Sequence, residues 1–418
     1  MGKPPRPCRR GFFYSIVTTD ESISLNNGAT LPPGFRAAGT HCGIKSSALD
    51  LALFVSDAPA SIAGAFTTNG VQAAPVRVCR ERLTGGKARA VVVNSGNANA
   101  CTGESGLRDA YRMAARTAEL LGLSEHEVFV SSTGPIGVNL PMAAIECGIP
   151  EAIQALSPNG GESAAHAIMT TDTVPKYVTT TLDLDGRCAR ITGIAKGSGM
   201  IHPGMATMLC YLLTDAAIDT DSLQACLSEA VQHSFNRITV DGDQSTNDTV
   251  LCLANGKAQN IPLHKGHADW RRFAASVQAI AIHLARRIVE DGEGASKLVT
   301  VHVRGGAGPA EADRVARAIA NSLLIKTSWA GSDPNWGRVL CAVGYSGASI
   351  EESKIDVYYD DLPAVRGGIG ADTPVHALRS VVGRKAFTIR IELHQGTGEA
   401  EIYACDTTEA YVRINVEE

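Results

Sequence analysis

The stretch KGSGMIHPGMATMLCYLLTD, from Lys196 to Asp215, determines which fold and which chemistry we predict. Its first half holds three glycines and Pro203, and this composition predicts a tight loop, because glycine reaches positive φ without a clash and proline fixes a bend. Its second half is apolar from Met208 onward and predicts a buried strand. Thr207 therefore stands where an irregular loop enters the core, with a side chain that is stiff at χ1. Such a hydroxyl suits a nucleophile, although a threonine at this place can also simply cap or fill.

Length and composition exclude several classes of protein. The chain has 418 residues, enough for more than one domain, and its 44% hydrophobic and 19% charged residues are typical of a globular enzyme. A formal net charge of -5 provides no basic surface for nucleic acid. The longest apolar runs are far too short to span a membrane. We therefore expect neither nucleic acid nor a membrane as a partner.

The cysteines and the N-terminal segment bear on the compartment. The 11 cysteines are scattered, odd in number and never spaced as C-x-x-C, so we expect free thiols in a reducing compartment, with no zinc cluster and no disulfide framework. The chain begins MGKPPRPCRRGFFYSIV, which lacks a full apolar h-region and a small-residue cleavage site. We predict a leader over residues 1–33 that can be disordered, and a cytoplasmic protein, with an organelle matrix as the minority alternative.

Periodicity predicts a mixture of strands and helices. Between residues 34 and 74, LALFV and AGAFTT predict two short buried strands separated by turn residues. Residues 107–121, 271–290 and 310–324 predict helices. Near the C-terminus, KIDVYYDDL, FTIRIEL, AEIYACD and EAYVRINV alternate like strands of a half-exposed sheet. We therefore predict a core over residues 34–300 and a smaller α/β domain over residues 301–418.

A polar string, DGDQSTN from Asp241, invites a calcium-binding interpretation. The sixth position of an EF-hand loop would be Thr246 instead of glycine, and the twelfth would be Cys252 instead of glutamate. We interpret the string as a hydrogen-bonded turn before a buried strand.

Several motifs together resemble one family. The run K-G-x-G-M-I-x-P-x-M-A-T-M-L over residues 196–209 is similar to the self-cleavage site of the ornithine acetyltransferases, also called the bifunctional glutamate N-acetyltransferases. The segments NSGNANACTG, SSTGPIG, TTDT, DGEGA and DPNWGR follow the order found in that family, from about Gly34 to Asn415. Independent motifs in the right order are stronger evidence than any one of them.

The resemblance implies roles for individual residues. It implies that the precursor cuts its own Ala206–Thr207 bond and that Thr207 becomes an N-terminal nucleophile. A threonine hydroxyl needs a base at neutral pH, and a free α-amine with a reference pKa of about 7.7–8.0 is matched to that task. The Thr133–Gly134 pair would form the oxyanion hole. The substrate would be held by Thr171, Lys196, Thr207, Glu293 and Asn415.

Most of these residues also have a plain alternative role. Thr171 could cap a helix end, Lys196 and Glu293 could be solvated, and the Thr133–Gly134 pair could be an ordinary turn. The DPNWGR segment is expected to fix a loop near the interface of the two halves of the protein. The chain also departs from the family at Gly204, where an asparagine is usual. The family usually continues several residues beyond its substrate-binding asparagine and ends in serine or threonine, whereas this chain stops at Glu418.

The implied reaction moves the acetyl group of N2-acetylornithine to glutamate through an acetyl-threonine. It needs no metal and no redox cofactor, and acetyl-CoA is a candidate second donor. The implied fold is mixed α and β, with stacked sheets flanked by helices as in N-terminal-nucleophile folds, and the two cleaved chains would associate as a heterotetramer of two pairs. The alternatives are a hydrolase or relaxed acyltransferase on the same scaffold, and a non-catalytic binding protein.

Overall fold

The computed structural model describes residues 15–18, 21–202 and 208–416. These residues form a larger sheet, a smaller sheet and a short hairpin of β1 (Ser15–Thr18) and β2 (Glu21–Ser24). The predicted cleavage site, Ala206 and Thr207, lies outside the described residues, as do Gly204, Glu418 and the first 14 residues of the predicted leader.

The larger sheet has eight strands in the order β6-β5-β4-β11-β9-β8-β7, with β3 paired to the first half of β4. Its strands are mostly continuous apolar runs, as expected for strands that are buried on both faces. They are β3 (Phe35–Thr40), β4 (Leu51–Phe66), β5 (Lys87–Ser95), β6 (Val128–Thr133), β7 (Lys176–Leu184), β8 (Arg187–Lys196), β9 (Leu209–Thr214) and β11 (Thr249–Ala254).

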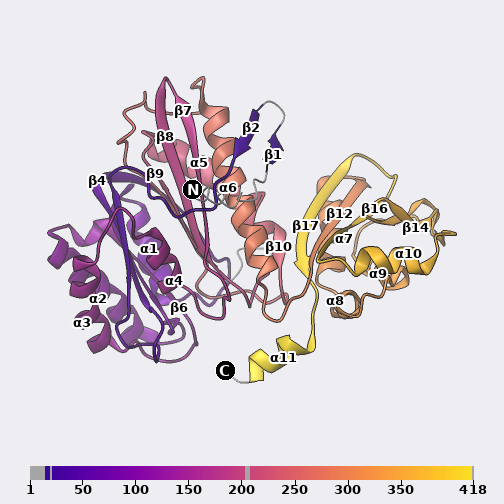
Figure 1. Cartoon of the computed structure of the whole chain (residues 1–418), viewed down its shortest axis with the longest axis horizontal. Coiled ribbons are helices and arrows are strands. Elements are labelled where there is room, and N and C mark those ends of the chain that lie inside the picture. Colours follow the sequence, from indigo (N-terminus) through magenta and orange to yellow (C-terminus); the bar gives the residue numbers. More distant parts are fainter. Residues whose placement is uncertain (1–14, 19–20, 203–207, 417–418) are drawn as a thin grey trace, which may run out of the picture.

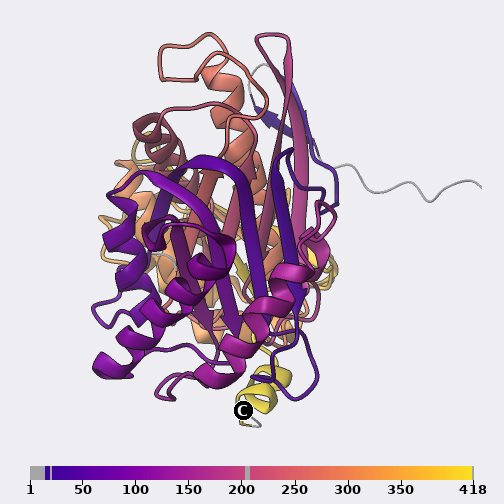
Figure 2. The same cartoon turned by 90° about the vertical axis from the view of Figure 1, so that its left-hand side faces the viewer.

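The long strand β4 bends, and its bend folds this sheet into two stacked layers. Figure 2 shows the indigo strand curving over the upper end of the sheet. The register with β5 shifts between Val55 and Ala60, the first half of β4 pairs with β3, and the second half pairs with β11. Phe54 on the first half contacts Tyr211 on β9, with 4.9 Å between ring centroids, across the interior between the layers. The prediction of two short strands is therefore wrong, because the turn residues bend one strand without ending it.

Helices cover both outer faces of this sandwich (Figure 1). Four helices pack on the layer of β3, β5 and β6, namely α1 (Ala74–Leu83), α2 (Gly103–Leu121), α3 (Met142–Gln154) and α4 (Gly161–Ala167). Two helices, α5 (Thr220–Gln232) and α6 (Trp270–Glu290), cover the other layer. Two 3₁₀ turns, η1 (Glu125–Glu127) and η2 (Phe235–Arg237), lie in connections. The predicted mixed α/β class, with stacked sheets flanked by helices, is confirmed.

The smaller sheet lies beside this sandwich and contacts α6 through the first two strands at one edge (Figure 1). Its order is β10 (Ile238–Thr239), β17 (Gly398–Cys405), β12 (Leu298–Gly306), β16 (Ala386–Glu392), β13 (Asp356–Tyr359), β14 (Leu362–Arg366) and β15 (Ile369–Gly370). One face is covered by α7 (Pro309–Ala320), α8 (Leu323–Ala330), α9 (Trp336–Tyr345) and α10 (Val375–Val382), with η3 (Glu352–Lys354) nearby. The domain boundary after residue 300 stays a prediction.

Three predictions for the C-terminal part are wrong. The helix expected over residues 310–324 ends at Ala320, because Ser322 caps a new helix, α8. The DPNWGR segment does begin with a short loop, residues 333–335, but this loop does not lie near the interface of the two halves as predicted. It leads into α9, which Asn335 caps by accepting the Arg338 N–H and which packs in the core of the smaller sheet. The run EAYVRINV forms the helix α11 (Glu409–Val416) and no strand. Strand β17 before it already has β10 and β12 on its two sides, so this run finds no free sheet edge there.

Candidate active site

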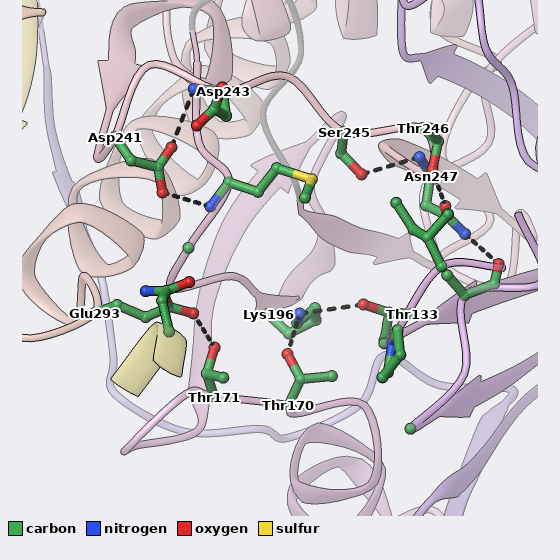
Figure 3. Close-up of a pocket in the computed structure, with 18 of the residues that line it drawn as sticks. Thr133, Thr170, Thr171, Lys196, Asp241, Asp243, Ser245, Thr246, Asn247 and Glu293 are labelled. Carbon is green, nitrogen blue, oxygen red and sulfur yellow. Dashed lines mark hydrogen bonds between the residues drawn. The ribbon is translucent and has the colours of Figure 1, made fainter. Parts of the chain in front are cut away.

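A polar pocket of about 600 Å³ opens at one end of the sandwich (Figure 3). At this end β8 finishes at Lys196, which is registered with Leu209 at the start of β9, and β11 begins beside β9 at Thr249. Because β4 bends, the C-terminal ends of β5 and β6 reach the same end from the other layer. The pocket therefore lies where segments from both layers meet.

Six of the predicted site residues line this one pocket. They come from five places in the chain, which are the end of β6, the segment after α4, the end of β8, the loop after α6, and helix α11. The six are Thr133, Gly134, Thr171, Lys196, Glu293 and Asn415.

Gly199 and Met200, from the segment that precedes residues 203–207, line the pocket as well. Met208, the first described residue after the gap, donates its N–H to the Asp248 carboxylate at 3.1 Å. On the other side of residues 203–207, the Met200 and Ile201 N–H groups are bound by the Asp241 carboxylate.

Lys196 organises the hydroxyl side of the pocket. Its Nζ donates to Thr170 Oγ1 at 2.6 Å and to Thr133 Oγ1 at 3.2 Å, and its side chain is 3% exposed. Burial lowers the pKa of Lys196, and the charge of Asp172 acts in the opposite direction. Because the Thr133 oxygen accepts from an ammonium group, its own hydroxyl hydrogen remains available for another acceptor.

The residue after Thr133, at the start of a turn, has to be glycine. Gly134 has φ of +139°, and a Cβ there would lie 2.4 Å from the backbone nitrogen of Asn97. Asn97 donates that N–H to the Thr133 carbonyl at 3.0 Å. In the described part of the chain, the Gly134 N–H has no hydrogen-bond acceptor. Thr133 and Gly134 thus present two unused donors at the pocket wall, which is the arrangement that stabilises an oxyanion.

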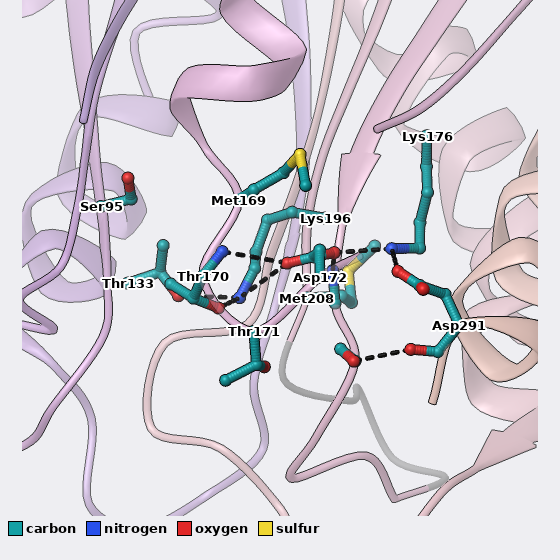
Figure 4. A network of polar contacts seen from close by, with 12 residues as sticks. Ser95, Thr133, Met169, Thr170, Thr171, Asp172, Lys176, Lys196, Met208 and Asp291 are labelled. Carbon is teal, nitrogen blue, oxygen red and sulfur yellow. Dashed lines mark hydrogen bonds and ion pairs between the residues drawn. The ribbon is translucent and has the colours of Figure 1, made fainter. Parts of the chain in front are cut away.

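A buried chain of alternating charges lies behind Lys196 (Figure 4). Asp172 lies 3.9 Å from Lys196 and accepts from Lys176 at 2.7 Å, and Lys176 also donates to Asp291 at 2.5 Å. Burial acts to raise the pKa of Asp172, but Lys196, Lys176 and the Gly197 N–H outweigh it and hold that pKa at about 2. Asp172 therefore stays ionised and compensates Lys196, whose ammonium group would otherwise be costly to bury.

Glu293 forms the opposite, acidic side of the pocket. Its carboxylate accepts from Thr171 Oγ1 at 2.7 Å and from Asn415 Nδ2 at 2.9 Å. Gly199 permits this close approach, because a Cβ there would lie 2.3 Å from the carboxylate. Asp241 lies on the same side, as Figure 3 shows, and accepts from the Met200 and Ile201 backbone at 2.6 and 2.9 Å. The pocket thus has a cationic side and an acidic side.

Sequence reasoning missed two kinds of residue that line the pocket. Asn247 was interpreted as part of a turn, yet its Nδ2 donates to the carbonyls of Ala98 at 2.6 Å and Ser132 at 2.8 Å and ties the two layers together. Asp241 and Asp243 belong to the same string. The sequence does hold a signal for these residues, because polar residues that precede neighbouring parallel strands meet at one edge of the sheet. Only the order of the strands in the sheet, however, shows that β9 and β11 are neighbours. Lys45 is the second kind of missed residue, because it belongs to no motif that the sequence analysis could recognise.

Fold and site together define a class of protein. The helix–sheet–sheet–helix sandwich encloses a small pocket with ammonium groups, carboxylates and free hydrogen-bond donors, which suits an enzyme that acts on a small molecule carrying both charges. Among the helices of the described residues, none is both long and apolar enough to cross a bilayer.

Comparison with known proteins gives the family. Residues 36–417 match the model of the ArgJ family. The arginine biosynthesis bifunctional protein ArgJ of Symbiobacterium thermophilum is 49% identical over 394 residues, which cover 94% of this chain and 98% of that protein. The protein of the same name from Geobacter sulfurreducens is 48% identical over 386 residues, covering 92% of this chain and 98% of that protein. The chain belongs to the ArgJ family, and the resemblance is confirmed.

Two solved structures are also similar to parts of the chain. The bifunctional protein argJ of Bacillus halodurans is 40% identical, covers 49% of this chain and 96% of its own, and has a TM-score of 0.48. The ornithine acetyltransferase of Mycobacterium tuberculosis, solved with ornithine, is 42% identical, covers 44% of this chain and 98% of its own, and has a TM-score of 0.41.

Proposed function

We propose that this chain is an amino-acid N-acetyltransferase that moves the acetyl group of N2-acetylornithine to glutamate. The support is membership in a family whose curated relatives are named arginine biosynthesis bifunctional proteins. The assignment of roles rests on one observation. Six residues that the motifs single out come from distant parts of the sequence and line one pocket.

The proposed nucleophile arises from cleavage of the chain itself. Thr207 Oγ attacks the carbonyl carbon of Ala206, the acyl group passes from nitrogen to oxygen, and water hydrolyses the resulting ester. The products are a carboxylate on Ala206 and a free α-amine on Thr207. That amine is the base that the hydroxyl needs.

In the first half of the proposed reaction, the amine takes the hydroxyl proton while Oγ attacks the acetyl carbonyl of N2-acetylornithine. The tetrahedral oxyanion accepts hydrogen bonds from Thr133 and Gly134. Its collapse breaks the amide C–N bond, and the proton goes to the α-amine of the leaving ornithine. The acetyl group remains on Thr207 as an ester.

In the second half, the α-amine of glutamate attacks this ester. The same donors hold the second oxyanion, the C–O bond breaks, and the proton returns to Thr207 Oγ as N-acetylglutamate leaves. Lys196 and Thr171 hold the amino-acid part that both substrates share, and Glu293 with Asn415 holds the side-chain ammonium of ornithine.

The remaining parts of the proposal concern donors, partners and compartment. The scheme requires no metal or redox cofactor, and acetyl-CoA is proposed as a second acetyl donor, since the relatives are named bifunctional. The two cleaved chains are proposed to form a pair, and two pairs a heterotetramer, in the cytoplasm.

A gel and a mass spectrum test the proposal. Purified wild-type protein should give two pieces on a denaturing gel, whereas Thr207→Ala should stay at full length. Wild-type protein mixed with N2-acetylornithine alone should gain one acetyl group on the piece that begins at Thr207. Equal gel patterns would refute the cleavage, and absence of acetyl-protein would refute the covalent route. Ornithine release that is equally fast without glutamate would favour the hydrolase.

A further inference from the structure

Lys45 is a second cation of the pocket, and the loop that carries it is built around a buried carboxylate. Asp50 accepts four backbone N–H groups from this loop. They include the N–H of Lys45 itself at 2.9 Å. Burial acts to raise the pKa of Asp50, but these N–H groups outweigh it and lower that pKa, so the carboxylate stays ionised. The backbone of Lys45 is therefore fixed, unlike that of a typical surface lysine.

The ammonium group of Lys45 is held in place but is not paired with a carboxylate. Its Nζ donates to the Met169 carbonyl at 2.6 Å and to the Leu49 carbonyl at 3.0 Å. An ammonium group has three donors, so one remains. Within the described residues no ion pair involves Lys45. Asp50 and Asp172 act on its charge only from beyond ion-pair distance, so its remaining N–H is available to a ligand in the pocket.

Lys196 also donates two hydrogen bonds, but unlike Lys45 it has a carboxylate within ion-pair distance. It donates to Thr170 and Thr133, and Asp172 compensates its charge. Lys45 and Lys196 are the only cations among the described residues that line the pocket. Burial lowers the pKa of Lys45, and the charge of Lys196 lowers it further, while Asp50 and Asp172 act in the opposite direction. An anion placed near Lys45 would relieve this repulsion.

The substrates of the proposed function differ in the charge at the end of the side chain. Ornithine ends in an ammonium group, which suits the acidic side of the pocket, whereas glutamate ends in a carboxylate. Asp241, Asp243 and Glu293 would repel that carboxylate. Of the two cations, Lys196 is the one proposed to bind the α-carboxylate that both substrates share, which leaves Lys45 for the side-chain carboxylate.

We infer that Lys45 binds the side-chain carboxylate of glutamate and thereby selects the acetyl acceptor. This inference rests on the proposed function and adds to it a residue that specifies glutamate. Lys45 would act as a binding residue of the second half-reaction, while the first half-reaction uses the acidic side of the pocket.

The test compares two acceptors in two proteins. Glutamine has the shape of glutamate without its side-chain charge, so kcat/KM is measured for both acceptors with N2-acetylornithine as the donor. In Lys45→Met, kcat/KM for glutamate should fall by about 10- to 100-fold, as expected for a lost charge-assisted hydrogen bond, while the value for glutamine should change by less than about threefold. Lys45→Arg should retain most of the preference for glutamate, because it keeps the charge.

The matched control is Lys265→Met, which removes an exposed lysine outside the pocket and should leave both values unchanged. Equal losses for glutamate and glutamine would place Lys45 on the α-carboxylate or in a structural role and would overturn the inference. No loss for either acceptor would overturn it as well. If Lys45→Met melts below the assay temperature, Lys45→Gln, which keeps a donor for the neighbouring carbonyls, takes its place.

The proposed function can fail separately. Wild-type protein that forms no acetyl-enzyme from N2-acetylornithine would refute the proposed reaction whatever the Lys45 variants do. Wild-type protein that transfers acetyl groups normally, together with a Lys45→Met variant that still prefers glutamate, would refute only the role of Lys45.

Discussion

Replacing Asp172 by asparagine tests whether the buried charges behind the pocket stabilise the fold. The side chains of Asp172 and Lys176 are fully buried, and Lys196 is nearly so. The pKa of Asp172 is shifted from 3.8 to about 2, which corresponds to about 2 kcal/mol of favourable interaction with its charge. Removing one partner of a buried ion pair costs more, about 3–5 kcal/mol, because the other charge is left uncompensated.

From the structure we expect the loss of stability in Asp172→Asn to lie near the lower end of that range. Lys176 would keep Asp291 at 2.5 Å, so only Lys196 loses its main counter-charge. We therefore expect the free energy of unfolding at pH 7 to fall by about 3 kcal/mol, measured as a lower urea midpoint with an unchanged m-value. The matched control is Asp57→Asn, which breaks an exposed pair with Arg36 and should cost less than about 1 kcal/mol.

A second variant separates charge from packing. Lys196→Met in the Asp172→Asn background removes the uncompensated ammonium group and should recover part of the lost stability. Two results would refute this account of the charges. One is an Asp172→Asn variant that is as stable as Asp57→Asn. The other is a double variant that is less stable than the summed effects of the two single variants predict.

Three further predictions follow from single residues. Gly134→Ala should lower the rate of acetyl transfer by about 100-fold or more, because a Cβ at +139° displaces an oxyanion donor, whereas Gly70→Ala, in open space, should leave that rate unchanged in the same assay. Asn247→Ala should lower the free energy of unfolding in urea by about 2–4 kcal/mol, since two buried carbonyls lose their donor, and a loss below 1 kcal/mol would contradict this role. Burial, together with the charges of Arg287 and Arg286, lowers the pKa of His283 to about 4. The contribution of His283 to the free energy of unfolding is therefore fully present above about pH 6.5, and about 2–3 kcal/mol of it is lost as the pH falls towards 4. His283→Gln should flatten this part of the curve of urea midpoint against pH.

The sequence predicts elements well where burial makes the pattern unambiguous. The long amphipathic period of α6 has few alternatives, and the apolar runs of β5 and β9 suit strands buried inside a two-layer sandwich. Strand β4 was predicted as two strands because Pro59 and Asp57 usually end a strand, and only the pairing of each half with a different neighbour keeps it continuous. Helix α11 has eight residues, too few to distinguish a period of 2 from one of 3.6.

The site was predictable only as far as its motifs extend. Thr133, Lys196 and Glu293 belong to recognisable strings, and the fold brings them to one pocket. Asn247 and Lys45 act through contacts that depend on which strands are neighbours and on how a loop wraps around Asp50. Such contacts have no local signature in a single sequence.

The same strand order predicts what cleavage between Ala206 and Thr207 would do to the assembly. Strand β8, before the predicted cut, pairs with β9, after it, over every residue from Ile191 to Lys196. Strands β4 and β11 pair across the cut in the same way, and the core that contains Ile280 takes residues from both sides. Cleavage would remove one covalent bond but none of these contacts.

The two pieces should therefore behave as one folded unit. Size-exclusion chromatography of fully cleaved protein should show both pieces in one peak, and urea should separate them only at concentrations that also melt the secondary structure. The Thr207→Ala precursor is the control, and its urea midpoint should lie at or above that of the cleaved pair, because its two halves stay linked. Pieces that separate without denaturant would show that the pairing of β8 with β9 does not hold the pocket together, and the lysine and glutamate sides of the site could then not act on one substrate.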